Sequence, residues 1–273
     1  MDISYILQNT IIYGSMAFVL ASVFSQHKYL NFSVGAFMIW IAYIMQSIFQ
    51  NGFSLFHIVY LGCIAGVFYF LDYFVYKSFT HRYTRELFGL IFTLGFTFFL
   101  VNSLFFVYGP QPISIERESI SYFGLTSLLI LIAGSIYFIY RYTCIGKVSR
   151  ANHENEHVIS TLSLGSRSIH GIHMTLSFLL LICVAYVITA DLSLFPDDNV
   201  FYLLKAIGVM IIVGVARLEY MFIGALAYVC IEHILFINLS LPLFFKEAFI
   251  LIVILAVLLI RPEGLFQTIN RKI

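Results

Sequence analysis

Long apolar blocks alternate with short polar joints along almost the whole chain. Several blocks reach about 16–20 residues, the length that a helix needs to cross the hydrocarbon core of a bilayer. The blocks are continuous rather than alternating with period two, and in lipid only helices or closed barrels satisfy the backbone. The pattern predicts an all-α polytopic membrane protein, one transmembrane domain over residues 1–273, with about 8–9 transmembrane helices. The blocks run over 6–24, 34–49, 56–75, 87–106, 125–140, 174–190, 203–215, 221–237 and 245–260.

Composition agrees with this class of protein. The chain is 61% hydrophobic and only 11% charged, whereas charged residues make up about a quarter of a soluble globular domain. The five prolines fall between or just after the blocks, where a missing N–H costs no helical hydrogen bond. The first block has no basic residue before it, so we expect a retained helix rather than a signal peptide.

Lysine and arginine predict the orientation. If the central polar loop is cytoplasmic, most basic residues fall on the cytoplasmic side, as the positive-inside rule requires. We therefore expect a multi-pass protein of the cell (inner) membrane, with its N-terminus outside and its C-terminus in the cytoplasm. The outer side would keep Arg117, Lys205 and Lys246; the inner side would hold Lys28, Lys77, Arg82, Arg85, Arg141, Lys147, Arg150, Arg167, Arg217, Arg261, Arg271 and Lys272.

Two interruptions break the regular pattern, at residues 25–31 and 216–220. The segments that resume after them look alike, Val34-Gly35-Ala36-Phe37 and Ile223-Gly224-Ala225-Leu226. One interpretation is an internal repeat with broken or re-entrant helices, which leave polar backbone along a pathway through the membrane. The other is a pair of tight turns with snorkelling Lys28 and Arg217.

The longest polar run, residues 141–173, is the one loop large enough to meet a soluble partner. Asn152 is a candidate N-cap, Glu154 would lie in the first helical turn, and Gly165 is a candidate C-cap, which predicts a helix over residues 152–164. Its apolar face of Val158, Ile159 and Leu162 could pack on the membrane helices or enter a groove on a cytosolic protein.

Ionisable residues inside the apolar blocks are candidates for function, because charge is costly there. Glu232 is a candidate for the pathway or for helix packing. Asp72 lies near Lys77, which predicts a snorkelling ion pair. The pairs His153/His157 and His170/His173 have helical spacing, but lack the further ligands of a metal site, so we expect solvated histidines and no bound metal.

Several motifs resemble those of one family. Leu30-Asn31-Phe32-Ser33-Val34-Gly35 resembles the early motif of branched-chain amino acid permeases, which are membrane subunits of ABC importers. The closing Arg261-Pro262-Glu263-Gly264-Leu265-Phe266 resembles that family's last motif and is the most specific match. The central loop, with Gly146-Lys147, Arg150-Ala151 and Leu164-Gly165, is similar to a coupling loop.

The chain departs from the family pattern at three places. Ser33-Val34 replaces the usual Ala-His, Ile159-Ser160-Thr161 replaces a Glu-Ala-Ala-like triplet, and a Gly-Gly-x-Gly turn is reduced to the segment 213–217 around Gly214. Because these changes lie near the predicted pathway, the resemblance supports energy-coupled transport more strongly than it supports the identity of the solute.

The resemblance implies a permease that moves branched-chain or other small amino acids, or a similar small polar solute, inward. Its implied partners are ATP-binding cassette subunits, a second homologous permease forming a heterodimer, a soluble substrate-binding protein and membrane lipid, but no nucleic acid. The chain has no phosphate-binding G-x-x-x-x-G-K-[ST] motif. We therefore expect no enzyme activity and no cofactor in this chain, with ATP and Mg²⁺ on the partner subunit.

The resemblance also suggests roles for individual residues. The coupling loop would use Gly146, Arg150, Glu154, Val158, Ile159, Leu162 and Gly165; the translocation pathway would use Asn31, Ser33, Gly35, Gly214, Gly224 and Glu232; the C-terminal family motif would be Arg261, Pro262 and Gly264. Two alternatives stay open. One is an ion-coupled secondary transporter, and the other is a permease-like scaffold that has lost transport.

Overall fold

The chain folds into a bundle of long helices. The computed structural model describes residues 3–27, 29–78, 82–110, 112, 122–154, 166–191, 194–215 and 217–239, with 252, 255 and 259. Its helices are α1 (Ile3–His27), α2 (Ser33–Asn51), α3 (Leu55–Ser78), α4 (Arg82–Tyr108), α5 (Tyr122–Tyr142), α6 (Cys144–Glu154), α8 (Ser166–Asp191), α9 (Asn199–Val213), the 3-10 helix η1 (Leu218–Tyr220) and α10 (Met221–Leu239).

These helices confirm an all-α multi-pass membrane protein. Six helices of the described part are long and apolar enough to span a membrane, namely α1, α2, α3, α4, α5 and α8. The shorter α9 and α10 are joined at a break and bent by 117°, and counting this pair as one span raises the number to seven. Eight of the nine predicted blocks lie on these helices, and the ninth, 245–260, lies almost wholly outside the described residues.

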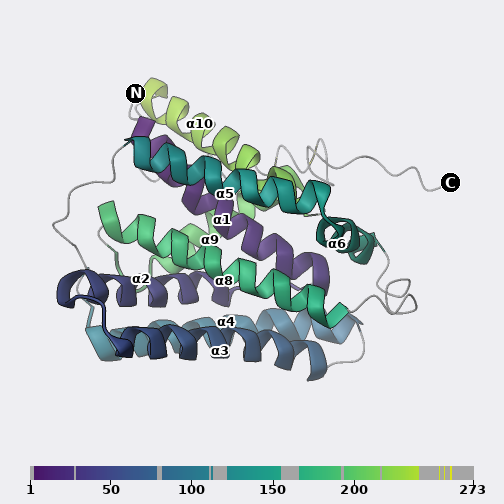
Figure 1. Ribbon diagram of the computed structural model, residues 1–273, viewed down its shortest axis with the longest axis horizontal. Helices are drawn as coiled ribbons and strands as arrows, with labels where there is room; N and C mark the ends of the chain where they lie inside the picture. Colours follow the sequence, from purple (N-terminus) through teal and green to yellow (C-terminus); the bar gives the residue numbers. More distant parts are fainter. Residues whose placement is uncertain are drawn as a thin grey trace.

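Helix α1 forms the centre of the bundle (Figure 1). It packs against α5, α8, α9 and α10, and 94% of its most apolar stretch is buried. Several of its polar residues find partners inside the protein: the Ser22 hydroxyl lies 3.0 Å from that of Ser177 on α8, and Thr10 donates to the Ile6 carbonyl at 2.6 Å. A central helix with polar side chains needs partners of this kind, because lipid offers none.

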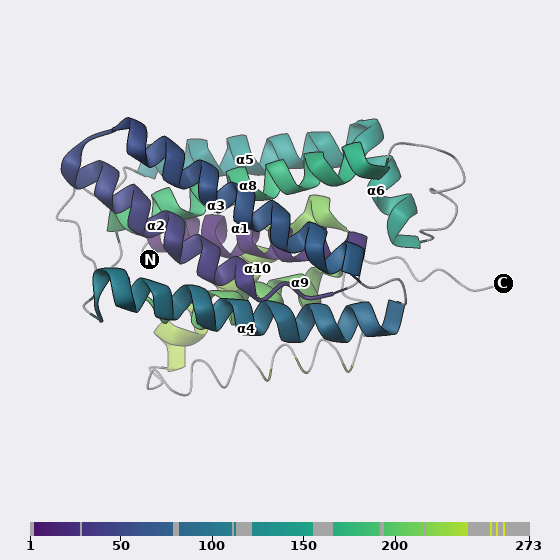
Figure 2. The same ribbon diagram turned by 90° about the horizontal axis from the view of Figure 1, so that it is seen from below.

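Helices α3 and α4 lie at the outside of the bundle, with α5 on another edge (Figures 1 and 2). Large apolar side chains are exposed along all three, among them Phe70 on α3, Phe98 on α4 and Leu131 on α5. In a membrane these surfaces face lipid, where exposed apolar side chains carry no penalty.

The short helix α6 lies at the end of the bundle away from the N-terminus, which we call the α6 end (Figures 1 and 2). Because successive helices run in opposite directions, α1, α3 and α5 all end here. The helix ends that precede the first three predicted inner joints thus share one end of the bundle.

The predicted start of the loop helix is wrong, and its predicted end at Gly165 lies outside the described residues. Helix α6 begins at Cys144, so Asn152 lies inside it rather than at its N-cap, and Glu154 ends the helix instead of opening it. The backbone explains this difference, because Thr143 N–H donates to Ile139 O and Lys147 N–H donates to Thr143 O. The hydrogen-bond ladder of α5 thus passes across the break and starts α6 early.

Candidate functional site

The two predicted interruptions fold differently. Between α1 and α2 the chain connects two full-length spans, whereas between α9 and α10 it forms a sharp bend. Gly214 ends α9 with φ of 92°, a conformation that favours glycine, and its N–H donates to Met210 O at 2.9 Å. Gly224 lets α10 approach α9, because a Cβ there would come within 2.0 Å of Val213 Cγ2. Both glycines shape the bend.

An ion pair joins the two arms of this bend inside the bundle. Lys205 Nζ on α9 lies 2.9 Å from Glu232 Oε1 on α10, and the two side chains are 6% and 2% exposed. The ammonium also donates to the Tyr13 hydroxyl on α1 at 3.1 Å. We call Lys205, Glu232 and Tyr13 the interior cluster. It ties together the central helix and both arms.

Aromatic rings surround the interior cluster. The Lys205 ammonium lies 4.2 Å from the centre of the Phe201 ring, a cation–π arrangement that is strongest where water is excluded. The Tyr13 ring packs edge-on against Tyr228, one helical turn from Glu232. The buried Tyr228 hydroxyl has no hydrogen-bond partner among the described residues. The cluster is thus a polar site enclosed by rings in an apolar bundle.

The charge distribution assigned Lys205 to the outer side without indicating how deeply it is buried. It lies within α9 and is almost completely buried. A lysine in an apolar helix is itself a signal of function, but its partner is 27 residues away. Spacing along the sequence therefore did not reveal the pair. Glu232, predicted for the pathway or for packing, is in the interior cluster.

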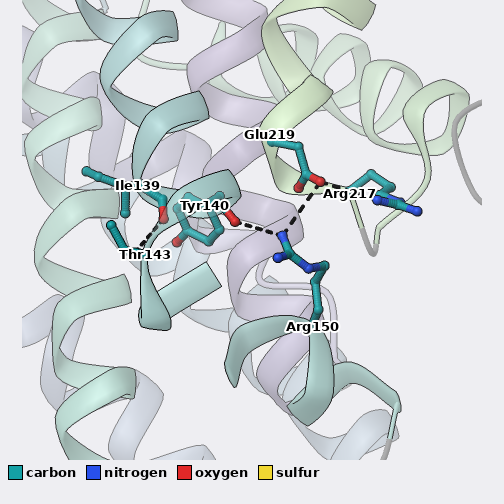
Figure 3. A network of polar contacts seen from close by, with 6 residues as sticks. All are labelled: Ile139, Tyr140, Thr143, Arg150, Arg217 and Glu219. Carbon is teal, nitrogen blue, oxygen red and sulfur yellow. Dashed lines mark hydrogen bonds and ion pairs between the residues drawn. The ribbon is translucent and has the colours of Figure 1, made fainter. Parts of the chain in front are cut away.

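A second polar cluster joins α6 to the bend (Figure 3). Arg150 on α6 donates to the Tyr140 carbonyl near the end of α5 at 2.7 Å and lies 3.7 Å from Glu219 Oε1. Arg217, in the joint between α9 and η1, lies 3.4 Å from the same oxygen. The Glu219 side chain is 1% exposed. We call Arg150, Glu219 and Arg217 the joint cluster, and sequence reasoning missed Glu219 as its centre.

Gly146 sets the position of α6. A Cβ at this residue would lie 1.9 Å from the Tyr140 carbonyl oxygen, so only glycine permits the approach. Ser149, one turn away, is also buried, while Lys147 points outward. Of the predicted coupling-loop residues, Gly146 and Arg150 therefore face the bundle.

The predicted pathway residues at the start of α2 organise the joint between α1 and α2. Asn31 Oδ1 accepts hydrogen bonds from the Ser33 N–H at 3.1 Å and from its hydroxyl at 2.5 Å. Gly35 packs against α9, because a Cβ there would lie 2.8 Å from the Asn199 carbonyl oxygen. None of the hydrogen bonds found among the described residues joins these three residues to the interior cluster. Their roles are local and structural.

Asp72 is fully buried and accepts a hydrogen bond of 2.6 Å from the Tyr29 hydroxyl. Tyr29 lies in the joint between α1 and α2, and it packs on Gly89 of α4, where a Cβ would come within 2.7 Å of the ring. The expected ion pair with Lys77 falls on a side chain outside the described part, and Asp72 itself is buried inside the protein.

His173 is not a solvated histidine. It is buried, and its Nδ1 lies 2.6 Å from the Tyr140 hydroxyl. Within the described residues, no three His, Cys, Asp or Glu side chains gather in a way that could hold a metal ion. The remaining predicted site residues, Val158, Ile159, Leu162, Gly165, Arg261, Pro262 and Gly264, and the side chain of Glu154 lie outside the described part.

At the end of the bundle opposite to the α6 end, Asp198 directly precedes α9. Its Oδ2 accepts a hydrogen bond from the Phe195 N–H at 2.8 Å. Burial raises the pKa of this carboxyl above its usual value, the Phe195 hydrogen bond opposes the rise, and the nearby Asp197 adds to it. The acidic side chains of Asp197 and Asp198 therefore lie close together at the N-terminus of α9.

Comparison with known proteins adds no relative. No protein-family model matches the chain, and neither the curated proteins nor the solved structures yield a match. The likeness to branched-chain amino acid permeases therefore rests on the sequence motifs alone. What the structure adds is a multi-pass helical membrane protein whose bent helix pair carries one polar cluster inside the bundle and another at its end.

Proposed function

We propose that this chain is the permease subunit of an ABC importer, which moves branched-chain or other small amino acids, or a similar small polar solute, inward. In this proposal the α6 end faces the cytoplasm and the loop around α6 meets an ATP-binding subunit. A second permease and a soluble substrate-binding protein complete the importer. ATP is hydrolysed on the partner.

The observation that carries the proposal is the joint cluster. Arg150 lies on a helix of the longest polar loop, and its partner Glu219 lies at the bend of two interior helices. A soluble protein that moves α6 would therefore act directly on the bend. Such a movement drives transport only if the partner binds the two conformations with different affinities.

The interior cluster supports a transport role more generally. Ionisable residues inside a membrane domain are rare and commonly mark the route of a substrate or ion. Lys205 and Glu232 lie on the bent pair itself. Because Lys205 and Glu232 carry opposite charges, the pair also favours a second candidate, an ion-coupled secondary transporter. In such a transporter, protonation of Glu232 or binding of a cation to it would separate Glu232 from Lys205.

The experiment that tests the proposal is gentle purification of the tagged chain from its own host, followed by mass spectrometry. Recovery of an ATP-binding subunit and a second permease supports the importer. The variants Val158→Asp and Leu162→Asp should then release the ATP-binding subunit, while Asn51→Asp at the exposed end of α2 should not. Recovery of the chain alone contradicts the importer. Uptake by the chain alone in proteoliposomes would then establish the second candidate.

A further inference from the structure

Glu219 is a buried carboxylate that two arginines share through one oxygen atom. Arg150 Nη1 lies 3.7 Å and Arg217 Nη1 lies 3.4 Å from Oε1, while the Glu219 side chain is 1% exposed. A carboxylate at this depth requires a positive partner, because an uncompensated buried charge strongly destabilises a fold. Either guanidinium alone supplies that charge.

The two arginines are not equivalent. Arg217 precedes Glu219 by two residues, so it moves with the bend. Arg150 belongs to α6 and also donates to the Tyr140 carbonyl, so it connects α5, α6 and the bend (Figure 3). The side chains of Arg150 and Arg217 are 28% and 22% exposed, so both can reorganise without being drawn out of a closed core.

We propose that Glu219 is an exchange point between these arginines. Arg150 fastens α6 to the bend, and Arg217 keeps the carboxylate paired when α6 moves away. Glu219 is thus a positioning residue, and Arg217 lowers the cost of releasing α6. The purpose of this release rests on the proposed function, but the exchange is a property of this chain alone.

The arrangement makes a physical prediction that a simple surface ion pair does not. Removing either arginine leaves one guanidinium on Glu219, whereas removing both leaves none. The double variant should therefore lose more stability than the two single variants together, since the effects of changing residues that share a partner are not additive. Neutralising Glu219 in the double variant should recover that excess.

Hydrogen exchange measured by mass spectrometry on the purified full chain tests the fastening. Arg150→Gln should speed exchange of the backbone amides of α6 by about tenfold, because a hydrogen-bonded charge contact is lost. Arg217→Gln should change exchange in α6 by less than about twofold, because Arg150 remains. Lys147→Gln removes an exposed charge from α6 and serves as the matched control; it should behave as the wild type.

Thermal unfolding tests whether Glu219 exchanges one arginine partner for the other. Each single arginine variant should lower Tm slightly, the double variant by more than the sum, and the addition of Glu219→Gln should restore the difference. If a single variant does not fold, Arg150→Lys keeps the charge but cannot bridge Tyr140 and Glu219 together, and should show intermediate exchange in α6. Equal loosening of α6 by both arginine variants, or strictly additive losses of Tm, would overturn the proposal.

These measurements need no partner protein, so they stand apart from the proposed function. If no ATP-binding subunit is recovered but the hydrogen-exchange and Tm results are as expected, Glu219 remains the point where the two arginines exchange. The proposal of an importer is then wrong. If the subunit is recovered, Arg150→Gln should reduce solute uptake per ATP hydrolysed in the reconstituted importer.

Discussion

Lys205 on α9 and Glu232 on α10 meet at 2.9 Å inside the bundle, so the two arms of a 117° bend are held by opposite charges. Tyr13 of the central helix takes part through a hydrogen bond of 3.1 Å. An ion pair at this depth has lost its hydration, and its attraction repays that cost only while both partners are present. The pair therefore fixes how α9 and α10 meet α1.

Removing one partner of this pair should be far more damaging than removing both. Lys205→Met leaves a buried carboxylate and should lower stability by about 3–5 kcal/mol, whereas Lys205→Met with Glu232→Gln should recover much of the loss. Thermal unfolding of the purified chain in detergent measures this. Lys147→Met, at an exposed position on α6, is the control and should change little. A double variant as unstable as Lys205→Met would contradict this view of the pair.

Gly146→Ala should displace α6. The added methyl group would lie 1.9 Å from the Tyr140 carbonyl oxygen, in a position where neither backbone can yield without moving a helix. We expect a fall of about 1–3 kcal/mol in stability, and faster proteolysis of the loop. Gly134→Ala is the matched control, since nothing lies near a Cβ there; it should be neutral or slightly stabilising. Equal behaviour of the two variants would refute the close contact.

Tyr29→Phe should weaken the joint between α1 and α2. It removes the hydroxyl that donates to Asp72 at 2.6 Å and leaves the ring on Gly89 in place. Loss of one donor to a buried carboxylate costs about 1–3 kcal/mol. Tyr60→Phe, on the exposed surface of α3, is the control. Urea or thermal unfolding of both variants checks the difference, and equal midpoints would show that the hydroxyl contributes nothing.

Asp198→Asn should stabilise the protein at neutral pH. Since folding raises the pKa of Asp198, this group favours the fold below its ordinary pKa and loses that contribution as the pH rises through the raised value. The amide oxygen of asparagine can still accept the Phe195 hydrogen bond. We expect a higher Tm than the wild type at about pH 7 and the same Tm near pH 3, where the carboxyl is protonated in both states. A gain that persists at the lower pH would contradict this cause.

The membrane class and nearly all helix positions could be predicted from the sequence, because lipid leaves the backbone few solutions. A continuous apolar block has to become a helix, and prolines and polar joints mark where it ends. The helix of the polar loop was misplaced because its start depends on Thr143 and the hydrogen-bond ladder of α5, not on a capping side chain such as Asn152.

The polar clusters were only half visible in the sequence. Glu232 could be singled out by its place in an apolar block, whereas Lys205 was counted only as an outer-side charge because charge counting says nothing of burial. Glu219 lies in a segment that was interpreted as a joint, and its contact with Arg150 joins residues far apart in the chain. Such pairings depend on how helices pack, which no local pattern contains.

The central place of α1 has a consequence for how the protein is made. Helix α1 is synthesised long before the helices that it packs against, because Ser177 follows Ser22 by 155 residues and Lys205 follows Tyr13 by 192. At about 5–20 residues per second, the wait for Ser177 is roughly 10–30 s. During that time the hydroxyls of Ser22 and Thr10 depend on acceptors within α1, the carbonyls of Val19 and Ile6. The packing of α1 is therefore complete only after α9 and α10, late in the described part of the chain, have been made.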